Sequence, residues 1–336
     1  MNEFVFLMGV LLVILTFVDA FVTILWVDGS AGPITSRVSR TTWKVFQALF
    51  PKRHRALSLA GPTILTVTLM LWIVLLCAGW VVAFSADPGA LKDARGPGMA
   101  DLPERVWFAA STMFTVGNGD AYPRGGFWEI MSSLLAMSGI VMVTIAVSYV
   151  LSVIPVVSQQ RALAAQVSNL GVSAEDFVIA AWDGTAFRRL DAQLDNLVQQ
   201  LGVLSDQHLG YPILHHFHAA DPDKATAPAL AILDDALTLL SCGVGAEARP
   251  APATLKTARA ATRNFLQVLS AGRIGPAREP PPPPDLQRLR DAGIPVVGEE
   301  AFAQALQSLH DQRRLLLGLV RDSGYDWPRD RHQTSR

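Results

Sequence analysis

The sequence has 336 residues, of which 50% are hydrophobic and 17% are charged, and its formal net charge is −1. Such a balance offers no excess of cations for a nucleic acid backbone, so no nucleic-acid partner is expected. The two cysteines, Cys77 and Cys242, lie far apart and predict neither a disulfide framework nor a cysteine-based metal site. Apolar residues are concentrated in 1–157, whereas 158–336 has the composition of a soluble chain.

Three apolar segments, 4–27, 61–84 and 126–157, predict membrane-spanning helices. At about 1.5 Å per residue, each is long enough to cross a hydrocarbon core of about 30 Å. The alternative for the first segment is a signal peptide, but its acidic start, "MNEF", and its length favour a true span. We expect an all-α membrane protein with three transmembrane helices, a re-entrant helix and loop between the second and third, and a helical cytoplasmic domain.

The loop between the first two spans is basic, which predicts that it is cytoplasmic. Its cations are Arg37, Arg40, Lys44, Lys52, Arg53 and Arg55. A multi-pass protein of the inner membrane follows, with its N-terminus outside and its C-terminal part in the cytoplasm. Residues 36–50 mix apolar and basic side chains, which fits either an amphipathic helix in the interface or a solvated basic loop.

Asp19 lies within the first apolar segment, where an ionisable side chain is costly. Two interpretations stay open. Its carboxylate pairs with a basic residue of another helix or of the 37–55 loop, or it lies close enough to the cytoplasmic interface to be hydrated.

Part of the segment between the second and third spans predicts a short helix over 102–113. Asp101 and Glu104 have the spacing of a capping box, and Pro103 is tolerated in a first helical turn. Such a helix is about 18 Å long, enough to enter a membrane halfway. Its last carbonyls would be unpaired there, and the negative end of the helix dipole favours a cation.

The next residues, "TVGNGD", alternate glycine with residues that have side chains. Asn118-Gly119 is typical of a tight hairpin turn, but a hairpin needs alternating strands on both sides. The upstream segment is helical, and "AYPRGGFW" leads directly into the third span. Alternating left- and right-handed backbone conformations, which glycine permits, would instead turn successive carbonyls toward one axis.

These residues resemble the pore helix and filter of the bacterial two-helix potassium-channel domain, here with one additional N-terminal transmembrane helix. The family signature Thr-Val-Gly-Tyr-Gly-Asp is matched here by Thr115, Val116, Gly117, Gly119 and Asp120. The aromatic pair of the family's pore helix is matched by Trp107 and Phe108. In some members a Tyr-Pro follows the signature, and Tyr122 and Pro123 match it. The resemblance covers residues 61–157, and Gly139 falls at the position of the family's inner-helix hinge. A glycine that lets helices approach closely is the other interpretation of Gly139.

The resemblance implies a pore domain in which 61–84 is the outer helix and 126–157 the inner helix. Carbonyls of Thr115, Val116, Gly117 and Asn118, with the Thr115 hydroxyl, would replace the hydration shell of K⁺, and Asp120 would sit with Gly119 at the outer end. Trp107, Phe108 and Ser111 would support the filter from the pore helix. Four copies must surround one ion, so the resemblance implies a homotetramer. The chain departs from the family at Asn118, usually Tyr, and at Phe114, often Thr.

The remaining sequence predicts a helical domain over 158–277, a proline-rich linker over 278–285, and helices near 285–291 and 299–322 followed by a tail within 286–336. Residues 1–60 and 61–157 form the N-terminal and pore segments. Pro155 would bend or end the inner helix. No phosphate-binding loop occurs, and no nucleophile–base pair is evident, so neither a cofactor nor enzyme activity is expected.

His208, His215 and His218 form a candidate transition-metal set. The alternative is that these side chains cap and pack helix ends.

The sequence therefore predicts a K⁺ channel in a lipid bilayer. A second hypothesis stays open: a non-conducting or weakly selective membrane-anchored sensor or scaffold that acts through its helical cytoplasmic domain.

Overall fold

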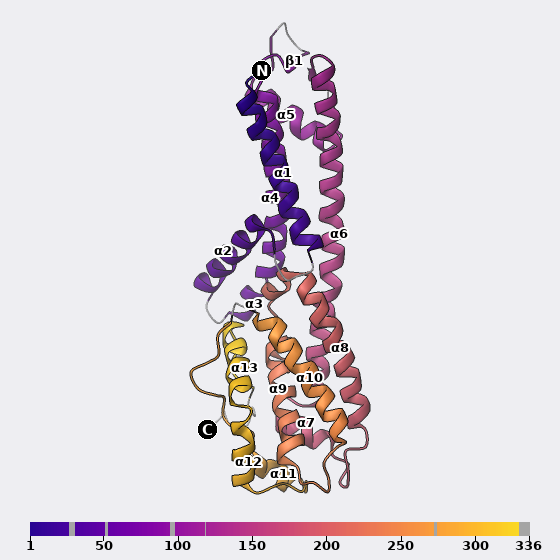
Figure 1. Ribbon diagram of the computed structural model, residues 1–336, viewed down its shortest axis with the longest axis vertical. Coiled ribbons are helices and arrows are strands. Elements are labelled where there is room, and N and C mark those ends of the chain that lie inside the picture. The colour runs from indigo at the N-terminus through magenta and orange to yellow at the C-terminus, as the bar shows by residue number, and fades with distance from the viewer. Residues whose placement is uncertain (27–30, 51–52, 95–97, 118, 272–273, 329–336) are drawn as a thin grey trace. The chain divides into compact units, whose positions relative to one another are not determined.

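The computed structural model describes residues 1–26, 31–50, 53–94, 98–117, 119–271 and 274–328. The chain divides into two compact units. The first holds residues 1–43, 62–154 and 211–213, and the second holds 44–61, 155–210 and 214–336. Figure 1 labels their helices and strands in chain order.

The first unit is built on α1 (Glu3–Leu25), α4 (Ala60–Ser85) and the first part of α6 (Gly126–Leu170). All three are long and apolar enough to cross a membrane, as the sequence predicts. Helices α1 and α4 approach closely because each has a glycine at the contact, Gly9 in α1 and Gly79 in α4. A Cβ on Gly9 would lie only 2.6 Å from the Gly79 carbonyl oxygen. The chain is a helical membrane protein.

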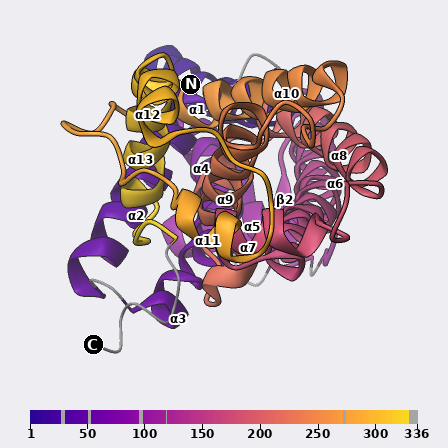
Figure 2. The same ribbon diagram turned by 90° about the horizontal axis from the view of Figure 1, so that it is seen from below.

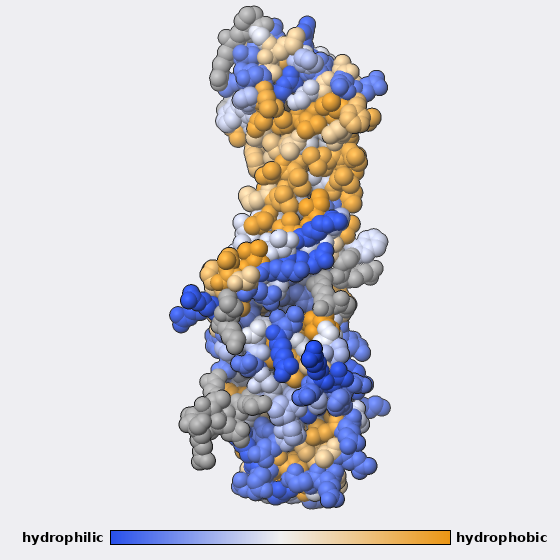
Figure 3. All heavy atoms as spheres, turned by 90° about the vertical axis from the view of Figure 1, so that its left-hand side faces the viewer, coloured by the Kyte–Doolittle hydropathy of each residue, from blue (hydrophilic) through white to orange (hydrophobic). Residues whose placement is uncertain are grey.

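The core of the first unit is aromatic and aliphatic, and its outer surface is apolar as well. Trp72, Leu76 and Phe84 of α4 are buried, together with Leu135 and Met142 of α6. Large apolar side chains are nevertheless exposed along α1, and they include Phe4, Leu7, Leu11, Ile14 and Val18. Figure 3 shows the resulting belt of hydrophobic residues. Such an extended apolar surface fits contact with lipid rather than water.

Among the residues that the structure describes, none forms an ion pair with Asp19, and its side chain is buried away from water, so neither interpretation from the sequence holds. Its side chain is 1% exposed and accepts hydrogen bonds from the backbone of Ile34 (2.7 Å) and Thr35 (3.2 Å), the Thr35 hydroxyl (2.6 Å) and Trp72 Nε1 (2.9 Å). Ile34 and Thr35 open α2 (Pro33–Leu49), whose first backbone N–H groups have no partners within the helix. Asp19 of α1 therefore caps α2 from outside.

The amphipathic segment is a helix, as one of the two interpretations of residues 36–50 predicts. Helix α2 exposes Arg37, Arg40 and Lys44, whereas Thr35 and Ser39 are buried. A short helix, α3 (His54–Leu57), follows and belongs to the second unit.

The second unit is a bundle of helices around α9 (Thr226–Thr238). Helix α10 (Pro252–Ser270) packs along α8 (Leu190–Gly210) and against α9, while α7 (Ala174–Ala181) and α13 (His310–Asp322) contact α9 as well (Figure 2). The smaller elements are η1 (Pro212–His216), η2 (Pro222–Lys224), the π-helical turn η3 (Leu239–Gly243), α11 (Leu286–Asp291) and α12 (Glu299–Gln307).

A fourth helix, Thr226–Gly243, is also long and apolar enough to be a span, but 83% of its apolar window is buried within the chain. Two carboxylates on it are paired inside the unit: Asp235 with Arg313 at 3.1 Å and Asp234 with Arg259 at 3.4 Å. We therefore interpret this helix as the core of the second unit.

The structure bears on three local expectations for the C-terminal part. Pro155 lies inside α6, which continues to Leu170, so it does not end the helix, and a bend there stays a prediction. The helix expected over 299–322 is two helices, α12 and α13. The proline-rich segment 278–285 is packed rather than free: Pro281 and Pro284 are buried, and the Pro282 carbonyl accepts a hydrogen bond from Arg313 at 2.8 Å. The tail from Arg329 lies outside the described residues.

Candidate functional site

Helix α5 (Leu102–Met113) has the bounds that the sequence predicts. Asp101 accepts a hydrogen bond from the Glu104 backbone at 2.9 Å, and Glu104 accepts one from the Asp101 backbone at 2.8 Å, which completes the capping box. These two bonds satisfy donors at the start of α5 that would otherwise lack partners. The start of α5 is therefore determined locally.

Arg105 joins α5 to the end of α4, and sequence reasoning missed it. The guanidinium is buried and donates to the backbone carbonyls of Phe84, Ala100 (3.0 Å), Asp87 (3.3 Å) and Pro88 (2.9 Å). Carbonyls at the end of a helix need such donors because they have no partner within the helix. No signal in the sequence identified these four acceptors, since they lie up to 21 residues away.

The three residues expected to support the filter do not share one environment. Phe108 is buried, with its ring 5.3 Å from that of Phe84 in an edge-to-face contact. Ser111 is buried, and its carbonyl accepts a hydrogen bond from the Val116 backbone at 2.8 Å. Trp107 is 47% exposed, so within one chain it does not pack behind the filter.

The backbone after α5 alternates in handedness. Thr115, Gly117 and Gly119 have φ angles of 58°, 61° and 71°, and Thr115 is the sole residue with a side chain that has a positive φ among those described. The left-handed conformation is strained for a residue with a Cβ, so surrounding structure must stabilise it at Thr115. Alternation at every second residue is the conformation expected of a ladder of carbonyls. Asn118 lies outside the described residues.

The residues after Asp120 form one strand of a small β-ribbon. Strands β1 (Leu91–Asp93) and β2 (Ala121–Pro123) are antiparallel, with Lys92 opposite Tyr122. The Asp120 carbonyl also accepts a hydrogen bond from the Ala94 backbone at 2.8 Å. The sequence predicts no strand after Asn118-Gly119. The strand exists, but it pairs with residues about thirty positions earlier and so forms no hairpin at Asn118-Gly119.

Gly139 lies where α6 passes the end of α5. A Cβ there would collide with the Met113 carbonyl oxygen and side chain, and α6 is helical through this position. Close packing therefore accounts for the glycine in this structure. A hinge at Gly139 stays a prediction.

The three histidines proposed as a metal set are not brought together, which corrects that interpretation. His208 and His215 are in edge-to-face contact at 4.3 Å, whereas His218 stacks on Tyr325 at 4.6 Å and lies beside His54. In the described part of the chain, no three His, Cys, Asp or Glu side chains are placed to share a metal ion. The packing role is the interpretation that the structure supports.

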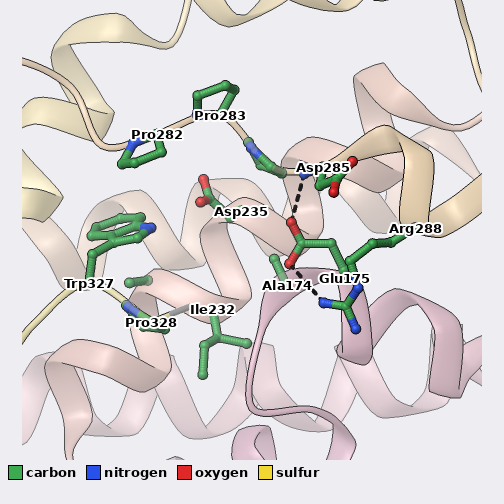
Figure 4. Close-up of a pocket in the computed structure, with 12 residues that line it drawn as sticks. Ala174, Glu175, Ile232, Asp235, Pro282, Pro283, Asp285, Arg288, Trp327 and Pro328 are labelled. Carbon is green, nitrogen blue, oxygen red and sulfur yellow. Dashed lines mark hydrogen bonds and ion pairs between the residues drawn. The ribbon is translucent and has the colours of Figure 1, made fainter. Parts of the chain in front are cut away.

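A pocket of about 240 Å³ lies in the second unit, beneath the proline-rich segment (Figure 4). Polar residues of the pocket interact with one another. The Glu175 carboxylate accepts a hydrogen bond from the Asp285 backbone N–H at 2.7 Å, and it lies 3.9 Å from the Arg288 guanidinium. Trp327 closes another side. Burial raises the pKa of Asp235 to about 7, against the opposing effect of Arg313.

Comparison with known proteins agrees with this architecture. Residues 70–155 match the family described as "Ion channel", which is the two-helix pore-loop domain. The chain is 35% identical, over 328 residues, to the uncharacterized membrane protein YdjJ of Bacillus subtilis (strain 168), and the match covers 98% of this chain and 96% of YdjJ. No solved structure matches. The chain thus belongs to the same family of membrane proteins as YdjJ, and its residues 70–155 are an ion channel domain.

Proposed function

We propose that four copies of this chain form a K⁺-conducting pore, in which the backbone of residues 115–119 is the selectivity filter. The observation that carries the proposal is the run of positive φ angles at Thr115, Gly117 and Gly119, directly after a half-length helix. A ring of backbone carbonyls can replace the water around K⁺. Potassium is chosen over other monovalent cations because of the resemblance of Thr115–Asp120 to the potassium-channel signature.

Exposed apolar residues after α5 and on α6 support assembly with further copies. In the single chain, Val116 is 60% exposed, and Ile130, Met137 and Ile140 of α6 are exposed as well. The carbonyls of Ala110, Ser111 and Thr112 at the end of α5 accept hydrogen bonds from residues 114–116, so they are not unpaired, in contrast to the expectation from the sequence. The non-helical backbone that follows α5 is tolerated in a membrane only where protein or a water-filled cavity surrounds it. A symmetric ring of copies would supply both, and it would cover this apolar surface.

The basic loop between α1 and α4 supports an orientation with the N-terminus and the β-ribbon outside and the second unit in the cytoplasm. The inner membrane of a bacterium is the proposed location. Asp120, the acidic residue after the filter, would then lie at the outer mouth and raise the local concentration of cations.

Flux into liposomes tests the proposal. Liposomes that contain the purified protein are loaded with KCl and diluted into NaCl, and K⁺ efflux is followed through the compensating proton uptake. We expect efflux from the wild type and at least about tenfold less from Gly117→Ala, because a Cβ in the left-handed conformation costs about 1–2 kcal/mol.

Gly125→Ala is the matched control. Gly125 also has a positive φ, 84°, and a Cβ at either glycine would meet no atom within 4 Å in the chain. Gly125 lies outside residues 115–119, so Gly125→Ala should retain efflux. Equal efflux from Gly117→Ala and the wild type would contradict the assigned filter, and absence of wild-type efflux from folded protein would favour the scaffold hypothesis. Liposomes loaded with NaCl and diluted into choline chloride test selectivity: Na⁺ efflux comparable to the K⁺ efflux would contradict the choice of K⁺.

A further inference from the structure

A second hollow in the second unit is lined by cations. It has a volume of about 470 Å³, lies between η3 and α10, and has four basic side chains in its wall: Arg249, Lys256, Arg259 and Arg263. No acidic residue lines it. Ligand pockets typically measure about 300–1,000 Å³, so the hollow suits a small molecule.

The positions of these cations concentrate positive charge on one face of α10. Lys256, Arg259 and Arg263 follow one another at intervals of three and four residues, which places them on the same side of a helix. Within the described residues, no carboxylate lies within 4 Å of Arg249, Lys256 or Arg263. Like charges in proximity repel, so an anion in the hollow would relieve an unfavourable interaction.

The Arg259 guanidinium is held in place by side chains of α9 and η3. One of its nitrogen atoms lies 3.4 Å from Asp234, and another donates to Thr238 Oγ1 at 3.1 Å and to Ser241 Oγ at 3.3 Å. Asp234 is 1% exposed. A guanidinium fixed by buried partners loses little conformational freedom when it binds a ligand, which favours affinity.

The hollow also has an apolar wall, formed by Pro252, Leu255 and Ala260. An inorganic ion would leave this wall exposed to water. A ligand with an anionic head and a carbon portion would cover it while its oxygen atoms accept hydrogen bonds from Lys256, Arg259 and Arg263. Four cations favour a dianion over a monocarboxylate, and a phosphate monoester is a dianion near neutral pH.

We propose that this hollow, the α10 cationic pocket, binds a small organic phosphate. Its phosphate contacts Lys256, Arg259 and Arg263, and its carbon portion lies on Leu255. A small molecule is favoured over an acidic protein or a membrane surface, because the four cations and the apolar wall line a single hollow of about 470 Å³. The proposal does not depend on conduction, since binding alone is its readout.

Titration calorimetry of the full-length protein in detergent tests it, with phenyl phosphate, inorganic phosphate and phenol as probes. We expect saturable binding of one phenyl phosphate per chain, weaker binding of inorganic phosphate and no binding of phenol. The double variant Lys256→Gln/Arg263→Gln should weaken phenyl phosphate binding by at least about tenfold, since each lost charge-assisted hydrogen bond contributes to affinity.

Two further variants make the outcome decisive. Arg189→Gln removes an exposed cation outside the pocket and should leave the affinity unchanged. Lys256→Arg/Arg263→Lys keeps both charges and should retain most of the affinity, even if the glutamine variant folds poorly. Absence of saturable binding to the wild type, equal affinity in the glutamine variant, or equal weakening by Arg189→Gln would overturn the proposal.

Discussion

His218 is held in one protonation state by its neighbours. Its Nε2 lies 2.9 Å from His54 Nδ1, and the rings of both histidines stack on Tyr325 at 4.6 and 4.9 Å. Burial and the nearby His54 lower the pKa of His218 to about 4, against the opposing effect of a backbone hydrogen bond with Ser323. The bond between the two rings needs one donor and one acceptor, so protons on both facing nitrogens would set two donors against each other.

This arrangement predicts a loss of stability in acid. The folded state favours neutral His218, so its contribution is complete above about pH 6.5 and declines as the pH falls toward 4. Between pH 7.5 and 5, the shift alone corresponds to about 2 kcal/mol, and after allowance for solvent screening we expect the free energy of unfolding to fall by about 1 kcal/mol from this group. Melting temperatures of the wild type and His218→Phe across this range measure it.

The difference in pH dependence between the wild type and His218→Phe reports on His218, because the other titrating groups are common to both proteins. His218→Phe keeps an aromatic ring against Tyr325 but cannot be protonated, so its melting temperature should fall less in acid. His310→Gln removes an exposed histidine and should leave the wild-type pH dependence intact. An identical pH dependence in His218→Phe and the wild type would show that this pair does not sense protons.

At the scale of elements, the start of α2 depends on a carboxylate from another helix. Asp19 accepts from two backbone groups of α2, and Trp72 of α4 donates to the same carboxylate, so one side chain joins three helices. A further bond, from the Gly32 backbone to Thr23 Oγ1 at 2.9 Å, fixes the residue before α2. The first turn of α2 is thereby joined to α1 and α4.

Replacement of Asp19 should release the first turn of α2. We expect Asp19→Ala to lower the free energy of unfolding by about 2–3 kcal/mol, because it removes hydrogen bonds to a charged acceptor and leaves buried donors without partners. Hydrogen exchange at the Ile34 and Thr35 amides should become faster. Thr16→Val is the control, since Thr16 is buried on the same helix but bonds only to the Leu12 carbonyl. Unchanged exchange at both amides in Asp19→Ala would contradict the capping role.

Elements were predictable from the sequence where their determinants are local. The bounds of α5 follow from Asp101 and Glu104, which lie three residues apart and cap each other. By contrast, Asp19 and the β-ribbon depend on partners 15 to 53 residues away, and three of the four acceptors of Arg105 lie 17 to 21 residues away. A sequence gives the chemical type of such a residue but not its partner. That is why the cost of burying Asp19 was recognised but its role was not.

At the scale of the whole molecule, hydropathy separated the membrane segments from the rest. It was less informative within the second unit, where Thr226–Gly243 is apolar because it is the centre of a bundle and not because it meets lipid. The filter motif was recognisable because its glycines are needed by the backbone itself. The histidines were grouped wrongly, because closeness in sequence does not bring side chains together when each packs on a different partner.

The central claim is that four chains share one conduction path, and mixing of subunits tests it most directly. Wild-type and Gly117→Ala chains that carry the same tag are expressed together, purified through that tag, and compared in liposome K⁺ flux at known ratios. If one altered subunit stops conduction, an equal mixture of a symmetric tetramer retains about one sixteenth of the wild-type flux. A decline in simple proportion to the wild-type fraction, to about one half in the equal mixture, would contradict a shared pore.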